Sequence, residues 1–269
     1  MEESLILSKF DHLVQSGLVL YDDKQQIIER IDSDLKFQFV LTSALAKKPT
    51  LATTPSQPEV DTQRSESHLV IVNKFCFARP HLIVLTFDGY KRQYEALDEA
   101  DLNDTWQILS SAERDYVAFY NCGQNGGCSR LHKHLQVMPL PANSFAAFLD
   151  SSEPESKVPF EWFYRRFEGD MTPTTLFGVY KNLLEEATKV GRDYTASAPP
   201  GAVCPHNMIL TKRWMIVLPR RRGAVNKEAG VNSLRMLGVI AVATMKEIDN
   251  WVKLGLTESL AKLGVPKGI

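Results

Sequence analysis

The segment 129–139, with the sequence Ser-Arg-Leu-His-Lys-His-Leu-Gln-Val-Met-Pro, constrains the fold of this chain more than any other. Its alternation of polar and apolar residues predicts a β-strand, in which successive side chains point to opposite faces of a sheet. His132, His134 and Gln136 would then share one face. The other face would pack into a core through Leu131, Leu135 and Val137.

A glycine-rich segment, 121–128, lies directly before this strand and reads Asn-Cys-Gly-Gln-Asn-Gly-Gly-Cys. Its glycines allow the backbone to approach a ligand closely and to direct N–H groups at an anion. The sequence therefore predicts a phosphate-binding loop. The donors expected from it and from the residues that follow are Gly127, Cys128, Ser129 and Arg130.

Each of these features taken alone has an ordinary structural interpretation. A single histidine on a strand is usually structural, and two histidines separated by one residue also occur in metal sites. An anion-binding loop followed by two imidazoles and a carboxamide on one strand face is more specific. This combination favours nucleotidyl transfer.

The segment 126–136 resembles the H-x-H-x-Q signature of the transferase branch of the histidine-triad superfamily. Its surroundings are similar to the ATP adenylyltransferase family of fungal type, also called the diadenosine tetraphosphate (Ap4A) phosphorylase family. The likeness extends over about residues 35–265. The segments that carry it are 72–81, 121–123, 207–211 and 218–220.

This resemblance implies a role for each residue of the motif. His134, the second histidine, would attack an α-phosphorus and form a covalent His–AMP intermediate. His132 would belong to the same network, and Gln136 would donate its amide N–H to the α-phosphate. Lys133 stands where an aliphatic residue is usual, and we expect its amine to reach solvent.

The resemblance also implies a reaction and further contacts. Gln136 replaces the third histidine of the related small hydrolases, which implies transfer to inorganic phosphate, so that Ap4A and phosphate give ATP and ADP reversibly. Further nucleotide contacts are expected along the chain. They are one of Lys47 and Lys48, then Asn73, Lys74 and Asn121, and in a second hairpin His206, Asn207 and Lys212. His81 is expected to be structural.

Two alternatives remain open at this point. Sugar-1-phosphate uridylyltransferases and nucleotide-sugar phosphorylases share the motif, although the former usually have a C-x-x-C metal pair and a proline between the histidines, which this chain lacks. A catalytically silent nucleotide-binding sensor is the second alternative. Products formed from Ap4A with and without phosphate would distinguish all three.

Composition limits the cofactors and partners. A net charge of −1 argues against nucleic-acid binding through bulk charge. The four cysteines have no zinc-site spacing, so we expect no protein-bound metal, and any Mg²⁺ would accompany the substrate phosphates. We expect free thiols, no signal peptide and no membrane segment. We also expect a cytoplasmic location, with the nucleus as a second option, and a monomer or homodimer with small-molecule substrates.

The order of the elements predicts an α+β fold with a largely antiparallel sheet. Two degenerate halves, 1–160 with the motif and 161–269, would each supply a hairpin and a helix to one sheet. The expected hairpins are 68–86 and 206–220, and the expected helices are 4–20, 98–120, 174–190, 231–254 and 257–263. A strand at 36–41, a strand or short helix at 160–167 and a polar loop at 48–67 complete the prediction.

Overall fold

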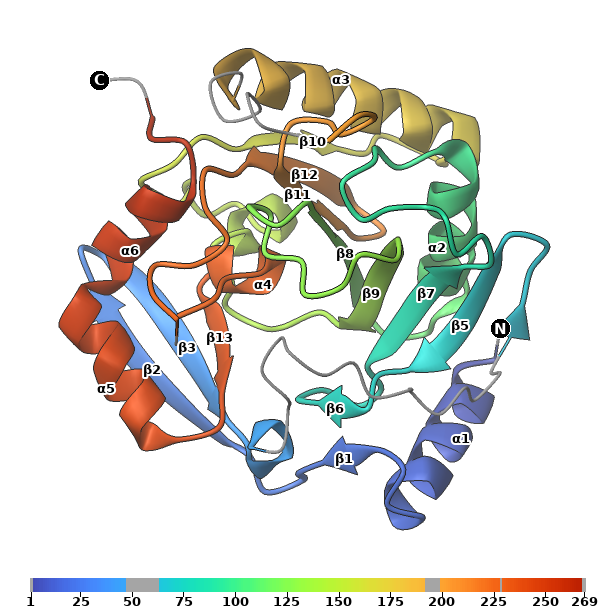
Figure 1. The fold of residues 1–269 in the computed structure, drawn as a ribbon, viewed down its shortest axis with the longest axis horizontal. Helices are drawn as coiled ribbons and strands as arrows, with labels where there is room; N and C mark the ends of the chain where they lie inside the picture. Colours follow the sequence, from blue (N-terminus) through green and yellow to red (C-terminus); the bar gives the residue numbers. More distant parts are fainter. Residues whose placement is uncertain (1, 47–62, 192–198, 228, 268–269) are drawn as a thin grey trace.

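An eight-stranded antiparallel sheet forms the centre of the computed structural model, which describes residues 2–46, 63–191, 199–227 and 229–267 (Figure 1). The strand order is β10-β12-β11-β8-β9-β7-β5-β4, so strands from both predicted halves continue one another. The bounds are β4 Gln63–Arg64, β5 His68–Val72, β7 Leu82–Thr86, β8 Tyr116–Cys122, β9 His134–Pro139, β10 Phe163–Arg166, β11 His206–Leu210 and β12 Trp214–Pro219. This architecture confirms the predicted α+β fold; the domain boundary near 160 stays a prediction.

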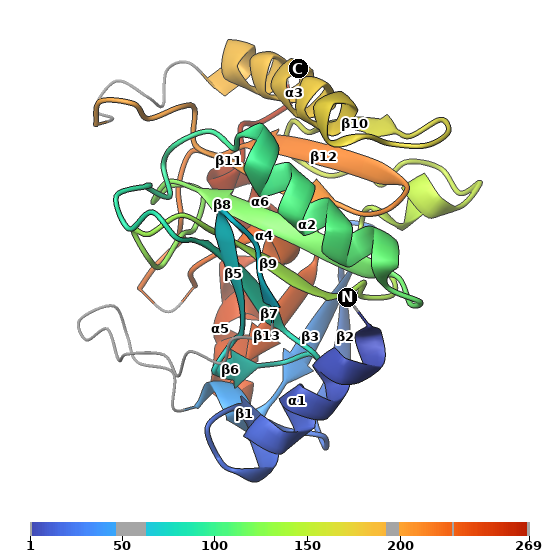
Figure 2. The ribbon, with the colours of Figure 1, turned by 90° about the vertical axis from the view of Figure 1, so that its right-hand side faces the viewer.

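Two hydrophobic cores lie on the two faces of this sheet. One face is covered by helices, of which α2 and α3 cross the sheet in Figure 2. These helices are α1 Glu3–Gln15, α2 Glu99–Ser111 and α3 Pro173–Gly191. We call this the helical face.

The opposite face packs against a smaller sheet of three strands in the order β13-β3-β2, and against short helices. We use the name "open face" for this side of the sheet, which also carries the motif side chains described below. Its covering elements are β2 Gln26–Asp32, β3 Leu35–Leu41, β13 Val239–Val242, α4 Ser233–Met236, α5 Met245–Leu254 and α6 Leu256–Leu263. The remaining short elements are β1 Leu20–Tyr21, which pairs with β6 Phe75–Cys76, and the 3-10 turns Ser43–Leu45 and Ala147–Asp150.

The helix predicted over 98–120 is too long. The start of α2 is fixed by Asp98, whose side chain accepts the N–H of Asp101, while the Asp101 carboxylate accepts the N–H of Asp98. The helix ends at Ser111, and the run from Tyr116 forms β8, whose residues are all buried. Aromatic and β-branched residues suit a central strand better than a helix, and the sheet supplies partners on both sides.

The helix predicted over 231–254 is also wrong. It divides into α4, β13 and α5, and Gly238 separates the first two at a positive φ of 83°. A Cβ atom at Gly238 would lie 2.5 Å from the Phe145 ring, so only glycine fits this turn. The apolar run Val239–Val242 then pairs in parallel with β3. Local periodicity did not reveal this strand because its partner lies about 200 residues earlier.

Several other elements match the predictions closely. Both hairpins form, β10 occupies 163–166, and α3 and α6 lie where helices were expected. The first helix ends before 20, because the chain turns at Gly17 with φ 74°. Strand β2 was not predicted, since most of its side chains are exposed and its pattern is weak. The predicted loop 48–67 falls largely outside the described residues. In the described ranges, no helix is long and apolar enough to cross a membrane.

Candidate active site

His134 is the first residue of β9 and lies buried on the open face, with 6% of its surface exposed. It pairs with Leu85 of β7. Gln136 follows two residues later and pairs with Phe119 of β8, which belongs to the core of the open face. The prediction that His134 and Gln136 share a sheet face therefore agrees with the structure. Leu135 and Val137 pack on the helical face, also as predicted.

The imidazole of His134 has a defined tautomer. Its Nδ1 lies 2.8 Å from the carbonyl oxygen of His132, which can only accept a hydrogen bond, so Nδ1 carries the proton. Burial lowers the pKa of His134 to about 4, and the positive charge of Arg130 acts in the same direction. At neutral pH the ring is therefore uncharged, and its Nε2 presents a lone pair.

A second residue, which sequence reasoning missed, fixes the backbone of His134. The Gln93 side chain is buried, and its Oε1 accepts the N–H of His134 at 2.8 Å. Its Nε2 donates to the carbonyls of His134 at 3.0 Å and Asn121 at 3.2 Å. Gln93 thus clamps β8 to β9 at the nucleophile. A lone glutamine in a polar loop gives no sequence signal for this role.

Gln136 is oriented by His81, which the sequence analysis had treated as structural. The Nε2 of His81 lies 2.9 Å from the Oε1 of Gln136, and because an amide oxygen only accepts, the imidazole donates. The amide nitrogen of Gln136 is then directed away from His81 and has two hydrogens to donate. Asn73, one of the predicted contacts, lies beside this pair, with its Nδ2 3.4 Å from the same His81 nitrogen.

The segment before His134 is not the strand that was predicted. His132 forms only an isolated bridge with Arg92, and its Nε2 contacts the Thr86 hydroxyl at 3.0 Å. Leu131 is 70% exposed and not in the core. Lys133 is 1% exposed, so the expectation that its amine reaches solvent is wrong. Its side chain crosses to α2 on the helical face.

The glycine-rich loop has no room for a side chain at two of its glycines. Gly127 has φ 84°, and a Cβ atom there would lie 1.9 Å from the carbonyl oxygen of Val231. A Cβ atom at Gly126 would lie 2.1 Å from the Cys122 carbonyl oxygen. The loop therefore needs glycine for close packing of backbone on backbone. The N–H groups of Gly127 and Cys128 donate within the loop, to Gln124 and Gly123, so these two do not point outward as predicted.

A buried polar network holds this loop against the second half of the chain. The Nδ2 of Asn207 donates to the Gly126 carbonyl at 2.7 Å and to the Asn121 side chain at 3.1 Å, and its Oδ1 accepts from Arg220 at 2.5 Å. The Asn121 Oδ1 also accepts from the N–H and hydroxyl of Ser233. All three side chains of this network are buried, so their role is to hold the glycine-rich loop in place. They are those of Asn121, Asn207 and Arg220.

Arg220 is the first of three consecutive arginines, a sequence pattern that is typical of an exposed basic cluster. It is fully buried, and burial lowers the pKa of its guanidinium to about 9. Its nitrogens also donate to the carbonyls of Arg222, Val231 and Leu263. The Arg220 side chain therefore links three segments of the chain through hydrogen bonds and does not face a ligand.

Three residues at the rim of the loop remain as candidate phosphate contacts. Ser129 is exposed, and Arg130 and Cys128 are half-buried. Burial lowers the pKa of Arg130, and within the described ranges no hydrogen bond or ion pair of its guanidinium is found. Burial raises the pKa of the Cys128 thiol to about 11, which keeps it protonated. Arg130 is thus the cation closest to the motif along the chain that can meet an incoming phosphate.

The structure does not bring every predicted contact to the open face. His206 lies on the helical face, where its Nε2 meets the Tyr180 hydroxyl at 3.0 Å. Lys212 lies at the far end of β11 and donates to the Ala112 carbonyl at 3.0 Å. Lys74 is half-exposed, with its amine 6.0 Å from the centre of the Phe75 ring. Lys47 and Lys48 lie outside the described residues.

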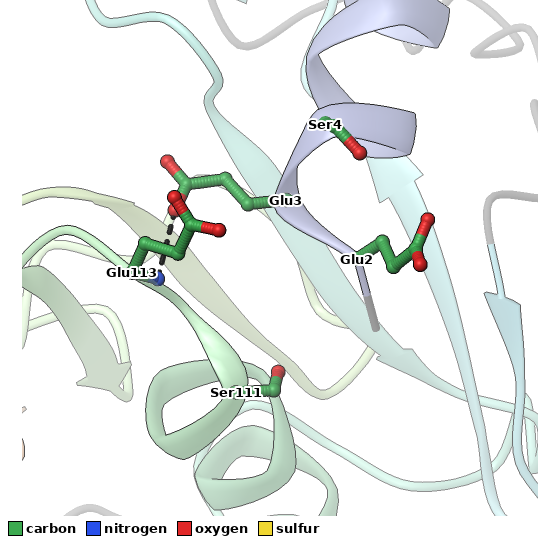
Figure 3. Close-up of a pocket in the computed structure, with 5 residues that line it drawn as sticks. All are labelled: Glu2, Glu3, Ser4, Ser111 and Glu113. Carbon is green, nitrogen blue, oxygen red and sulfur yellow. Dashed lines mark hydrogen bonds between the residues drawn. The ribbon is translucent and has the colours of Figure 1, made fainter.

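Among the described residues there is no cluster of three or more histidines, cysteines or carboxylates suited to a metal ion, and all four cysteines are free. A separate surface hollow is lined by Glu2, Glu3, Ser4, Ser111 and Glu113, where the N–H of Glu113 donates to the Glu3 carboxylate (Figure 3). Its three glutamates are unsuited to a polyphosphate.

Two family models match this chain. The Ap4A phosphorylase N-terminal domain matches residues 30–150, and the ATP adenylyltransferase C-terminal domain matches residues 156–266. Together they span most of the sequence, and they meet in the segment between the motif strand and β10.

Curated relatives and solved structures are also similar to this chain. Diadenosine 5',5'''-P1,P4-tetraphosphate phosphorylase 2 of Saccharomyces cerevisiae is 28% identical over 219 residues, and Protein APA1 of the same yeast is 27% identical over 207. The matches cover 71% and 68% of this chain but 66% and 64% of the two relatives, slightly less than two thirds. The crystal structure of yeast Ap4A phosphorylase Apa2 has a TM-score of 0.81 at 23% identity, over 99% of this chain and 98% of that one.

Proposed function

This chain belongs to the Ap4A phosphorylase family, and we propose that it is a nucleotidyltransferase that converts Ap4A and inorganic phosphate into ATP and ADP. The observation that carries this proposal is the tautomer of His134. Its Nδ1–H is bound to the His132 carbonyl, so the Nε2 lone pair is available to attack phosphorus at neutral pH.

The first step is transfer of AMP to the enzyme. Nε2 of His134 forms a bond to the α-phosphorus of one adenylate, and the bond between that phosphorus and the bridging oxygen breaks. The remaining triphosphate leaves as ATP, a stable anion that needs no proton from the protein. The ring becomes positively charged in the intermediate, and its Nδ1–H still donates to the His132 carbonyl, which stabilises that charge.

The second step is transfer of AMP to phosphate. An oxygen of inorganic phosphate forms a bond to the α-phosphorus, the Nε2–P bond breaks, and ADP leaves. Gln136 would donate its amide N–H to a non-bridging oxygen of the phosphorus in both steps, since His81 holds the amide oxygen on the other side. Arg130 and Ser129 would contact the remaining phosphates.

Both alternatives that the sequence left open lose support. Both family models describe Ap4A phosphorylase or ATP adenylyltransferase domains, which do not favour an enzyme of nucleotide sugars. A silent sensor would not need the uncharged imidazole and the oriented glutamine. The solved relative Apa2 has also been crystallised with Ap4A and with AMP, which supports small nucleotides as the ligands of this chain.

Isotope transfer tests the proposed reaction. Purified protein is incubated with Ap4A and phosphate labelled with ³²P, and the nucleotides are separated. We expect the label in the β-phosphate of ADP, ATP in equal amount, and no products from His134→Ala. Release of AMP at the same rate without phosphate would show a hydrolase, and faster turnover of an ADP-sugar or UDP-sugar would show the nucleotide-sugar alternative. Tight Ap4A binding without turnover would show a sensor.

Other properties remain part of this proposal. We propose that any Mg²⁺ enters bound to the substrate phosphates, because phosphate oxygens are its preferred partners and the described residues form no metal cluster. Free cysteines are consistent with a reducing compartment, so we propose a cytoplasmic or nuclear location. The oligomeric state, monomer or homodimer, stays a prediction.

A further inference from the structure

Lys133 stands between the two motif histidines, yet its side chain points to the opposite face of the sheet. The amine is buried against the first turn of α2, where its Nζ lies 2.5 Å from Oδ2 of Asp101 and donates to the Ala96 carbonyl at 2.8 Å. Both side chains of the ion pair are 1% exposed. A buried lysine opposite a nucleophile is a specific and energetically demanding arrangement.

Asp101 is itself held rigidly. Its Oδ2 also accepts the N–H of Asp98 as part of the helix cap, and its Oδ1 accepts from Nε2 of His68 at 2.9 Å. The other nitrogen of His68 lies 2.8 Å from the Asp104 carboxylate. The charges of Lys133 and His68 therefore face those of Asp101 and Asp104, and the Asp98 carboxylate lies 3.8 Å from the Lys133 amine. These contacts anchor Lys133 to α2.

The backbone of Lys133 leads from this anchor to the nucleophile. The peptide group between His132 and Lys133 has its N–H directed to the Lys91 carbonyl at 3.2 Å and its C=O directed to Nδ1 of His134 at 2.8 Å. A rotation of this one peptide plane would withdraw the carbonyl that fixes the tautomer. This peptide plane ends at the Cα of Lys133. The Lys133 side chain extends from that atom, and its anchor on α2 resists the rotation.

We propose that Lys133, through its ion pair with Asp101, is a positioning residue that keeps the His132 carbonyl on Nδ1 of His134 and so leaves Nε2 unprotonated. It touches no substrate and acts from the far side of the sheet. The catalytic consequence of this role rests on the proposed function, whereas the tautomer itself does not.

The test compares Lys133→Met with a matched control, Lys91→Met. The Lys91 side chain is 42% exposed, and its amine lies 3.7 Å from the Asp98 carboxylate. The tautomer is read from long-range ¹H–¹⁵N spectra of histidine-labelled protein, with His134→Ala for assignment. We expect Nδ1–H for His134 in the wild type and in Lys91→Met, and a mixture of both tautomers in Lys133→Met.

Kinetics provide a second, separate readout. We expect kcat for Lys133→Met to fall about 10- to 100-fold with little change in KM, as for a misplaced nucleophile, and Lys91→Met to stay near wild type. An unchanged tautomer in folded Lys133→Met would overturn the inference. If the wild type shows the Nδ1–H form but no phosphorolysis, the proposed function fails, and the tautomer of Lys133→Met alone decides the positioning role.

Further variants keep the test decisive. Asp101→Asn removes the same anchor from the helix side, and Lys133→Met/Asp101→Asn removes both charges together, which restores neutrality if either single variant fails to fold. Since both residues act through one ion pair, the double variant should show the same mixed tautomer and the same loss of kcat as either single variant. A pure Nδ1–H signal in any folded variant of this set would contradict the inference.

Discussion

His134 and His206 begin strands of the same sheet, separated only by β8, and their imidazoles lie on opposite faces. Each Nδ1 donates to the carbonyl two residues earlier, at 2.8 Å to His132 and at 2.7 Å to Cys204. Burial lowers the pKa of both rings to about 4. The two rings differ at Nε2, because Nε2 of His206 forms a hydrogen bond with the Tyr180 hydroxyl. Only His134 is therefore placed to act as a nucleophile.

The first prediction concerns covalent labelling. With labelled Ap4A and no phosphate, the wild type should accumulate AMP on His134 as an acid-labile, base-stable adduct. His134→Ala should lose adduct and turnover by several orders of magnitude, and His206→Ala, if folded, should still label. His132→Ala should retain some labelling, since its backbone carbonyl remains. Labelling of His134→Ala at the wild-type rate would contradict the assignment.

The second prediction concerns pH. Because the uncharged imidazole attacks, the rate of adduct formation should fall only as pH falls through about 4. Single-turnover labelling at pH 5 should then be within about a factor of two of that at pH 7. An unperturbed pKa of about 6.5 would instead give a loss of about 25-fold. A midpoint near 6.5 would show that burial does not set the charge of His134.

The third prediction concerns the pair of His81 and Gln136. Gln136→Ala should lower kcat about 100- to 1000-fold, because it removes a donor to the phosphorus oxygens. His81→Phe should cost about 10-fold, by freeing the amide to rotate. Since His81 acts through Gln136, adding His81→Phe to Gln136→Ala should cause no further loss. Additive losses in the double variant would show an independent role for His81.

The fourth prediction revises the role expected for Asn207. Its side chain is enclosed and bonded to Gly126, Asn121 and Arg220, so Asn207→Ala leaves a buried guanidinium with one partner fewer. We expect a loss of about 1–3 kcal/mol in the free energy of unfolding, measured in urea. The control is Asn125→Ala, because Asn125 is a half-buried asparagine of the glycine-rich loop. Full stability of Asn207→Ala with weakened nucleotide binding would restore the ligand role.

The sequence could predict those features of the site that depend on residues close together in the chain. The motif, the choice of His134 and the common face with Gln136 follow from residues within one strand and from the family pattern. Gln93, His81 and the Asn121–Asn207 network are formed by side chains from separate segments. A single polar residue in a loop or at a strand end has no periodicity that would mark it.

The fold followed the same division. Short apolar runs joined by a few connecting residues predicted both hairpins and the antiparallel sheet, because these signals are local. The end of α2 at Ser111 and the conversion of 239–242 into β13 were decided by partners distant in sequence, since a short apolar run becomes a strand only where another strand pairs with it.

Lys133 shows the limit most clearly. The sequence by itself determined that it lies between two histidines of a nucleotidyl-transfer motif, and its charge favoured solvent. Only the tertiary structure placed Asp101 and the Ala96 carbonyl beneath it, so that the amine could be buried with its charge paired. Burial of a charge depends on compensating groups brought from elsewhere in the chain, and local sequence carries no record of them.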